Sequence, residues 1–164
     1  MTRHPNPITM QEASSLNSVA EFHTTFKHPI VQQPAIPSEA RCNLRVALLA
    51  EEVSELQQAI ADKDLVEIAD ALCDIQYVLA GAILEFGLGD KFKALFDEVH
   101  RSNMSKACTT IDEANATVAH YLAKDNSESY IKEEDSKFLV YRTADDKTLK
   151  SINYSPADLK GLLL

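Results

Sequence analysis

Apolar residues recur every three or four positions through most of the first 124 residues, and this period predicts amphipathic α-helices. Ser38 precedes the longest of these segments and is a favoured N-cap residue, and Gly87 follows the next segment as a typical helix terminator. The short link between these two segments predicts neighbouring antiparallel helices. The predicted helices cover residues 16–26, 39–60, 65–86 and 91–104, followed by a shorter helix from its cap Thr110 to Ala123.

The pattern changes after residue 124. Residues 138–141 and 149–152 are short apolar runs on either side of a turn rich in aspartate, which predicts a β-hairpin. Ser155 and Pro156 have the form of a cap and first position of a last short helix ending at Leu164. The sequence therefore predicts an all-α fold in three parts: a flexible lead (1–15), an α-helical domain (16–124) and a tail with a β-hairpin (125–164).

Acidic residues interrupt the inward stripe of the second predicted helix. Leu44 and Leu48 define that stripe, and at about 100° per residue its continuation falls on Glu51, Glu52 and Glu55. Burying three like charges carries a prohibitive cost unless a cation neutralises them. The pattern therefore favours a cation site at the end of this helix.

The next predicted helix has acids at matching offsets. Glu67, Asp70 and Asp74 fall within roughly 60° of one another, on a different face from its apolar residues. The short link lets Glu67 and Asp70 approach the glutamates of the preceding helix. An all-oxygen site without His or Cys favours Mg²⁺, with Mn²⁺ as a possibility, over zinc. A run of glutamates alone is more typical of a solvated face; the second acidic set on the adjoining helix reverses that preference. The apolar face of this helix consists of Ile68, Leu72, Ile75, Leu79 and Phe86.

A third polar segment, Ser102-Asn103-Met104-Ser105-Lys106, ends the fourth predicted helix. Asn103 continues the apolar stripe of that helix, and Lys106 lies three residues further on. These two side chains suit contacts with a nucleotide's base or sugar and with a phosphate. Taken alone, a polar helix end with Lys106 near the last carbonyl groups is the simpler interpretation.

The overall composition narrows the class of protein. A formal net charge of -9 argues against a nucleic-acid-binding groove. Three cysteines, widely spaced, indicate reduced thiols in a cytoplasmic protein. The longest apolar stretch, residues 75–84, is too short to span a bilayer, and the first ten residues lack a signal-peptide core.

At these residues the chain resembles the MazG-like family of all-α nucleoside triphosphate pyrophosphohydrolases, which includes phosphoribosyl-ATP pyrophosphohydrolases. The resemblance covers roughly residues 16–106 and rests on EExxE followed by ExxD on consecutive helices. These acids are Glu51, Glu52, Glu55, Glu67 and Asp70. The resemblance implies a four-helix-bundle core completed by dimerisation and Mg²⁺-dependent cleavage of a nucleoside triphosphate between its α and β phosphates, giving monophosphate and pyrophosphate.

The same resemblance implies roles for individual residues. Glu52, Glu55, Glu67 and Asp70 would be the principal metal ligands, and Glu51 a ligand or the base that activates water. Glu55 is expected to be essential for turnover. The residues implied to contact substrate are Asp74, Asn103 and Lys106.

Other interpretations remain open. A di-iron bundle would need Glu-x-x-His pairs, and only Asp97-Glu98-Val99-His100 comes near that pattern; His23 and His28 suit surface or helix-end positions better than metal ligation. A non-catalytic helical module that docks a basic partner through its acidic face is a second alternative. Phosphoribosyl-ATP of histidine biosynthesis is a third, within the same fold. Because one chain has few bundle helices, we expect a homodimer or a dimer of dimers.

Overall fold

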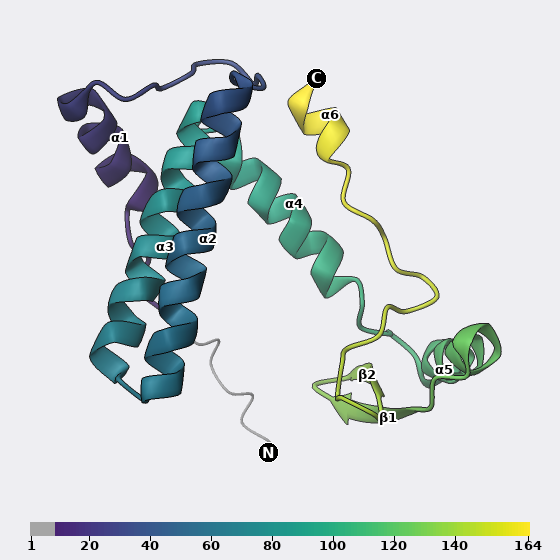
Figure 1. Cartoon of the computed structure of the whole chain (residues 1–164). Coiled ribbons are helices and arrows are strands. Elements are labelled where there is room, and N and C mark those ends of the chain that lie inside the picture. Colours follow the sequence, from purple (N-terminus) through teal and green to yellow (C-terminus); the bar gives the residue numbers. More distant parts are fainter. Residues whose placement is uncertain (1–8) are drawn as a thin grey trace. The chain divides into compact units, whose positions relative to one another are not determined.

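The computed structural model describes residues 9–164, which are mostly helical with one small antiparallel hairpin (Figure 1). The predicted all-α class with a C-terminal hairpin is confirmed at this level, and the five longer helices begin and end within two residues of the predicted positions. The elements are α1 (Ser15–Phe26), α2 (Glu39–Asp62), α3 (Leu65–Glu85), α4 (Phe92–Met104), α5 (Ile111–Asp125), β1 (Ser129–Glu134), β2 (Lys137–Arg142) and α6 (Leu159–Leu163).

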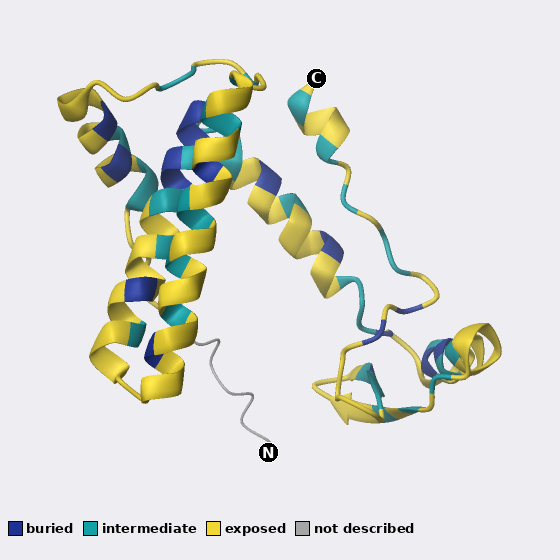
Figure 2. Ribbon diagram, in the orientation of Figure 1, coloured by how far each residue is buried: buried dark blue, intermediate teal, exposed yellow. Residues whose placement is uncertain are grey.

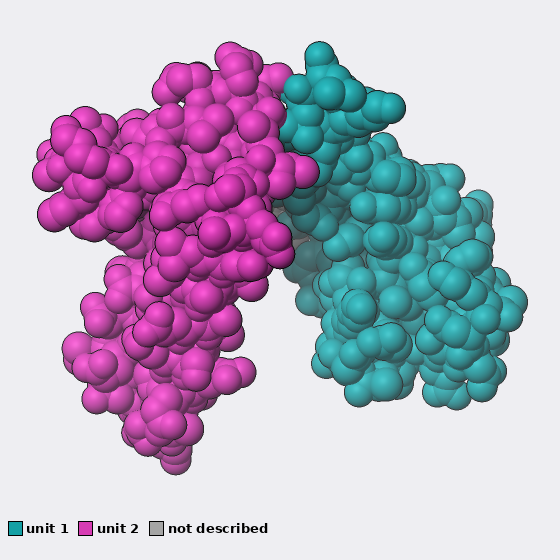
Figure 3. All heavy atoms as spheres, turned by 45° about the horizontal axis from the view of Figure 1, so that its top comes forward, with its two compact units in different colours: residues 1–8, 93–164 teal, residues 9–92 magenta. Residues whose placement is uncertain are grey.

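The described chain packs into two compact units, Thr9–Phe92 and Lys93–Leu164 (Figure 3). The first holds α1, α2 and α3, and the second holds nearly all of α4 together with α5, the hairpin and α6. Part of the predicted flexible lead lies outside the described residues. The predicted domain boundaries at 16 and 125 stay predictions, because they were drawn on sequence pattern and not on packing.

The antiparallel pair α2 and α3 forms the body of the first unit. Lys63 ends α2 in the left-handed conformation, with φ of 56°, and its N–H bonds back to carbonyls of the last turn. Asp64 then caps α3, its side chain accepting hydrogen bonds from the N–H groups of Val66 and Glu67 at 2.9 and 3.2 Å. A link of two residues therefore turns the chain back on itself.

The buried line of α2 differs from the predicted one. Arg45 and Ala59 are buried and Glu52 is half-buried between them, at seven-residue intervals, whereas Leu44 is 40% exposed. The predicted stripe is therefore wrong at Leu44, whereas Leu48, its second member, is half-buried. The physical reason is that Arg45 can occupy the seam with α3 in place of an apolar residue, because a buried carboxylate neutralises the charge of its guanidinium.

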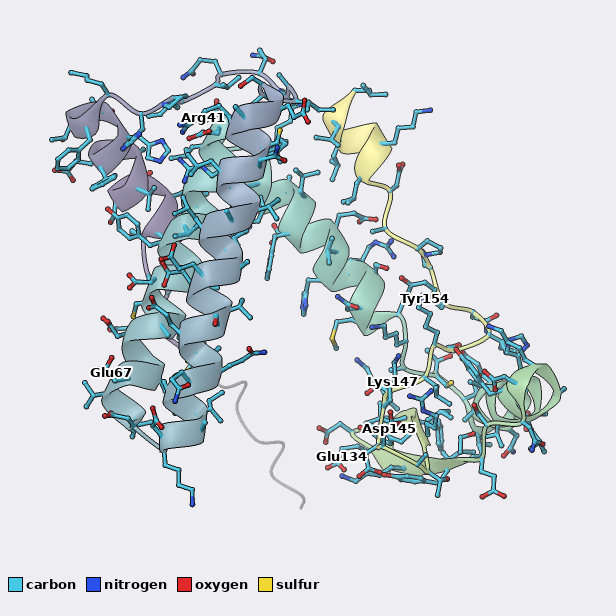
Figure 4. All side chains as sticks on the ribbon, viewed as in Figure 1. Arg41, Glu67, Glu134, Asp145, Lys147 and Tyr154 are labelled. Atoms are coloured by element: carbon cyan, nitrogen blue, oxygen red, sulfur yellow. The ribbon has the colours of Figure 1, made fainter. Side chains whose placement is uncertain are left out.

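That carboxylate belongs to Glu85, which is 1% exposed near the end of α3. Arg41 Nε donates to Glu85 Oε2 at 3.0 Å, and Arg41 and Arg45 both donate to Oε1 through Nη2. Burial alone would raise the pKa of Glu85, but the hydrogen bonds from the two arginines outweigh it and hold that pKa below its usual value. Figure 4 labels Arg41 at this end of the α2–α3 helix pair.

His23 completes this network: it lies near the end of α1, one of the two kinds of position predicted for it, but it is buried and not at the surface. Its Nδ1 hydrogen-bonds the Pro29 carbonyl at 2.8 Å, so Nδ1 carries the proton and Nε2 faces Arg45 Nη2 at 3.4 Å. Burial lowers the pKa of His23. A Cβ at Gly81 would lie 2.7 Å from Arg45 Nη1, so the absence of a side chain there makes room for the guanidinium.

The segment after α1 is fastened along the end of α3. Val31 N–H donates to the Leu84 carbonyl at 3.0 Å, and Ala35 N–H donates to the Phe86 carbonyl at 3.1 Å. Gly87 has φ of 68°, and a Cβ there would lie 2.0 Å from the Gln33 carbonyl oxygen, so only glycine fits. These bonds hold α1 against α3, where a small core forms from Val19, Ala80 and Leu84.

The second unit is built on α5 and the hairpin. Ser129–Glu134 pairs with Lys137–Arg142, so the predicted apolar strand is β2 and its partner is the polar segment before it. Residues 149–152, predicted as the second strand, form no named strand. Polar residues suit β1 because one face of a two-stranded hairpin is solvated. The core of this unit gathers Cys108, Ala114, Val140 and Leu149.

The last helix also begins later than predicted. Asp158 and not Ser155 is the N-cap of α6, its side chain accepting from the Gly161 N–H at 3.0 Å. Ser155 instead contacts α4, as described below.

Large apolar side chains stay exposed along α2 and α3 (Figure 2). The predicted apolar face of α3 is only partly covered within the described chain: Leu72 and Leu79 are exposed, whereas Ile68, Ile75 and Phe86 are half-buried. Leu65, seven residues before Leu72, is also exposed (77%). Residues at the same seven-residue spacing are exposed on α2: Val46, Val53 and Ile60. Of the described helices, none combines the length and the apolarity that a bilayer crossing needs.

Candidate functional site

The acidic residues of α2 and α3 concentrate around the turn between the helices. Residues 51–74 contain eight of the chain's 25 acidic residues and one of its 16 basic residues. All of them lie in the Thr9–Phe92 unit. Negative charge is therefore concentrated in the part of the α2–α3 pair next to the turn.

Glu52 is the centre of this concentration. It is half-buried and lies on the same line of α2 as Arg45 and Ala59, which faces α3. Burial raises the pKa of Glu52, and neighbouring negative charges raise it further. In decreasing order of effect, these neighbours are Asp74, Glu55, Glu51 and Asp70. The structure thus brings four of the other five predicted acids within electrostatic reach of Glu52.

The sixth predicted acid, Glu67, lies with two of the others around a hollow of about 260 Å³ near the turn (Figure 4). Glu55 and Asp70 share this hollow with it, so the acids of both helices line one surface depression. The full lining consists of Glu55, Gln58, Ala59, Asp62, Asp64, Glu67, Asp70 and Ala71.

Sequence reasoning missed the contributions of Gln58, Asp62 and Asp64 to this hollow. Gln58 Nε2 donates to Asp62 Oδ2 at 2.9 Å, and Asp64 is used as the cap of α3. The four-residue spacing of Gln58 and Asp62 is a signal that was available. Among the ion pairs of residues 9–164, none involves Glu55, Glu67 or Asp70, so these three carboxylates are available to a ligand.

The donor set and the electrostatics suit a hard cation. All the acidic donors are oxygens. The pKa of Glu52 is raised by burial first and then by neighbouring negative charges, whose repulsion a divalent cation would relieve. In their present rotamers, no three His, Cys, Asp or Glu side chains of the described chain are arranged to hold a metal ion. The helices therefore bring acidic residues onto one seam without arranging any three of the described ones as a group of metal ligands.

Asn103 and Lys106 belong to the Lys93–Leu164 unit and are described with it. The Asn103 side chain is exposed near the end of α4, and Lys106 is half-buried just beyond it. The Lys106 carbonyl accepts a hydrogen bond from the Ser151 N–H at 3.1 Å. Their predicted contact with substrate stays a prediction, as does that of Asp74.

The di-iron alternative finds no support in the arrangement of potential ligands. His100 is exposed on α4, and no group of three or more potential metal ligands forms around it or elsewhere in residues 9–164. Of the two other histidines considered, His23 is buried against Arg45 and hydrogen-bonded to a carbonyl.

Comparison with known proteins gave a match to a family and a similar viral protein. A family model described as phosphoribosyl-ATP pyrophosphohydrolase matches residues 19–103, which contain all the acids discussed above. An uncharacterised protein of Acanthamoeba polyphaga mimivirus, L479, is 25% identical over an alignment of 243 residues. That alignment covers 93% of this chain and 97% of the viral protein, so it continues past residue 103 into the tail.

Proposed function

Because this chain belongs to the phosphoribosyl-ATP pyrophosphohydrolase family, we propose that it is a Mg²⁺-dependent pyrophosphohydrolase of nucleoside triphosphates. The proposed reaction splits the bond between the α and β phosphates and yields a nucleoside monophosphate and pyrophosphate. The single observation that supports it most is the acidic seam, where Glu52 meets four like charges inside a match to a pyrophosphohydrolase family.

The proposed metal-holding residues are the carboxylates of both helices. When bound, Mg²⁺ supplies charge neutralisation of the phosphates and acidification of water, with Mn²⁺ as a substitute. The residues proposed for this role are Glu52, Glu55, Glu67 and Asp70, with Glu51 either as a further ligand or as the base that activates water. A negatively charged seam does not exclude a negatively charged substrate, because divalent cations reverse the local sign of the charge.

The chain's own contribution to the reaction is positioning and proton transfer. A carboxylate that is not engaged by a cation can accept the proton of the attacking water, and exposed Glu51 is our candidate. Asp74 faces Glu52 in the seam and is our candidate for contact with the substrate's sugar. Asn103 and Lys106 are proposed to contact the nucleotide and a phosphate.

A second candidate substrate is phosphoribosyl-ATP, because that compound is in the description of the matching family. It carries the same triphosphate and would be cleaved at the same bond. The described residues include no feature that we can assign to recognition of the phosphoribosyl group, so we place the general triphosphate first.

We further propose that two copies of the chain pair through the exposed apolar residues of α2 and α3. Val46, Val53 and Ile60 recur every seven residues on α2, the period of a helix–helix seam. Leu65, Leu72 and Leu79 repeat that period on α3. Pairing through both rows would complete a four-helix bundle, and a dimer of dimers fits these rows equally.

The test of the proposed function is a substrate panel with the full-length protein. Canonical, deoxy and damaged nucleoside triphosphates, together with phosphoribosyl-ATP, are incubated with Mg²⁺ or with EDTA. Pyrophosphate and orthophosphate are measured separately. We expect monophosphate and pyrophosphate in Mg²⁺ only; orthophosphate as the direct product would contradict cleavage at the α–β bond.

The matched variants are Glu55→Gln and Glu133→Gln, which make the same chemical change at two exposed glutamates. Loss of a metal-holding carboxylate should lower kcat by at least about a hundredfold, as the loss of one strong electrostatic contact does in other active sites. Glu133 lies on β1, outside the acidic seam, and its variant should keep the parental rate. Equal rates for both variants would show that the assigned site is wrong.

A further inference from the structure

The segment after the hairpin, residues 149–158, is fastened along α4 and is called the docked tail below. It lies outside residues 19–103, so membership of the family does not account for it. The Leu149 N–H donates to the Val140 carbonyl at 2.8 Å and Leu149 is buried, which fixes the start of the docked tail on the hairpin. From there its residues meet the end of α4.

Arg101 and Glu98 form the first set of contacts. Glu98 accepts two hydrogen bonds from Arg101, each at 2.8 Å, and its Oε1 also accepts the Asp158 N–H at 2.9 Å. Arg101 in turn donates to Ser155 Oγ at 3.0 Å and to the Pro156 carbonyl at 3.1 Å. The Arg101 side chain and the backbone bond to Asp158 lower the pKa of Glu98 to about 2.

Ser102 and Ser105 form the second set. The buried Ser102 hydroxyl pairs with the Tyr154 hydroxyl at 2.8 Å, and Figure 4 labels Tyr154 on the docked tail. Ser105 Oγ accepts the Ser155 N–H at 3.0 Å and donates to the Ser102 carbonyl at 2.7 Å. Side chains thereby hold the last turn of α4, in addition to the backbone bonds that Ser105, Lys106 and Ala107 donate to carbonyls of that turn.

Ser151 holds the residue just beyond α4. Its N–H donates to the Lys106 carbonyl at 3.1 Å, and its hydroxyl donates to Glu113 of α5. The next residue, Ile152, donates its N–H to the buried Thr117 hydroxyl at 3.1 Å. Residues 101–106 are therefore fixed from two sides, by the docked tail and through it by α5.

None of these hydrogen bonds of the described chain uses the Asn103 side chain or the Lys106 amino group. Asn103 lies about 100° around the helix from Ser102, so the face that meets the docked tail is not the face that carries Asn103. The contacts thus order the backbone of residues 101–106 and leave both side chains to a ligand.

We propose that Tyr154 and Ser155 are positioning residues that hold Asn103 and Lys106 ready for the substrate. This inference rests on the proposed function, in which those two residues contact the nucleotide. Without the docked tail, the end of α4 would fray as helix ends do, and substrate binding would have to order it. Tyr154 and Ser155 act through α4 and do not touch the substrate.

The test compares Tyr154→Phe with Tyr130→Phe in the full-length protein. Each change removes one tyrosine hydroxyl with one hydrogen bond: Tyr154 to Ser102, and Tyr130 to Asp146 on the hairpin at 2.9 Å. We expect Tyr154→Phe to raise KM up to about tenfold, the effect of losing one net hydrogen bond, with kcat nearly unchanged. The same variant should speed amide hydrogen exchange in residues 101–106, and Tyr130→Phe should change neither quantity.

A double variant, Ser102→Ala with Tyr154→Phe, separates positioning from stability. Removing both partners leaves no buried hydroxyl unpaired, so thermal stability should return toward the parental value. KM should stay raised, because the link between α4 and the docked tail is still missing. A KM that recovers along with the stability would overturn the proposal.

The outcomes also separate this proposal from the proposed function. A parental protein that hydrolyses no nucleotide overturns the proposed function, and the positioning role with it. A parental protein that is active, together with a Tyr154→Phe variant of parental KM and parental hydrogen exchange, overturns only the positioning role.

Discussion

Two glutamates in the same helix–helix seam have opposite electrostatic surroundings. Burial and like charges raise the pKa of Glu52, whereas hydrogen bonds from two arginines overcome burial and lower the pKa of Glu85. Ionised Glu52 therefore opposes folding, while ionised Glu85 favours it. At the scale of single residues, this contrast separates a carboxylate crowded by like charges from one that two cationic side chains already neutralise.

Glu52→Gln should stabilise the metal-free protein at pH 7.5 by roughly 0.5 kcal/mol, the size of a relieved like-charge contact. Because the pKa of Glu52 is raised in the folded protein, ionisation of Glu52 lowers the free energy of unfolding as the pH rises. The stabilisation by the variant should therefore vanish once the pH falls below about 4.5, where Glu52 is protonated in both the folded and the unfolded chain. Urea unfolding in EDTA at several pH values measures this. A variant less stable than the parent at pH 7.5 would contradict the repulsion.

Glu85→Gln should lower the free energy of unfolding by about 3 kcal/mol, because it leaves two arginines without their buried partner. Asp97→Asn is the matched control, since its ion pair with Lys93 is exposed and should contribute less than about 0.5 kcal/mol. Urea unfolding at pH 7.5 compares the two. Equal losses of unfolding free energy would show that the buried Glu85 network stabilises the fold no more than an exposed ion pair does.

His23 should make stability fall in mild acid. Because its pKa is lowered in the folded protein, the unfolded chain binds a proton first as pH drops below about 6.5. The free energy of unfolding should then decrease by at most about 1.4 kcal/mol per pH unit. Unfolding curves between pH 7.5 and 5.5 test this, and His23→Asn should flatten the dependence in that range.

At the scale of elements, helical period was enough to place five helices but not to identify their buried faces. The stripe through Leu44 failed because charged Arg45 is buried, and a charge can occupy a core line only when a distant residue neutralises it. Glu85 lies forty residues away, and that pairing leaves no local trace in the sequence.

The hairpin shows the same limitation in another form. Residues 138–141 were correctly taken as a strand, but the strand that pairs with them is the polar β1. Within the described chain, the predicted partner segment is joined to β2 only at its start, by the Tyr141–Thr148 bridge and the bond from the Leu149 N–H to the Val140 carbonyl. Pairing depends on the short turn at Asp135 and Ser136, both with positive φ, and not on matching apolar runs. The acidic seam, by contrast, was predictable, because helical spacing and a short link determine which side chains meet.

The link between α2 and α3 offers a prediction at this scale. Lys63 has φ of 56°, a conformation that costs an L-residue about 1 kcal/mol and glycine almost nothing. Lys63→Gly should therefore raise the free energy of unfolding by up to about 1 kcal/mol. Lys93→Gly, inside α4, should lower it by about as much. Thermal unfolding of both variants compares their stabilities. Destabilisation by Lys63→Gly would refute the left-handed conformation of residue 63.

At the scale of the whole molecule, the exposed rows on α2 and α3 determine what we expect in solution. Sedimentation should show at least a dimer, and Leu72→Glu should weaken association by at least about a hundredfold, because it would bury an unpaired charge. Ile36→Glu, at a fully exposed loop position, is the control and should leave association unchanged. A monodisperse parental monomer would contradict the proposed pairing.

The buried ion pairs of Glu85 and the two-residue link at Lys63 lie at opposite ends of the α2–α3 pair. These two features hold the backbones of α2 and α3 together at both ends, so repulsion between the acidic side chains does not separate the helices. Recruiting a cation would consequently restrict a few rotamers, at about 0.5–1.5 kcal/mol of lost entropy for each, without the larger loss that ordering a loop entails. A site on these helices would start from a prearranged scaffold whose flexibility is confined to side-chain torsions.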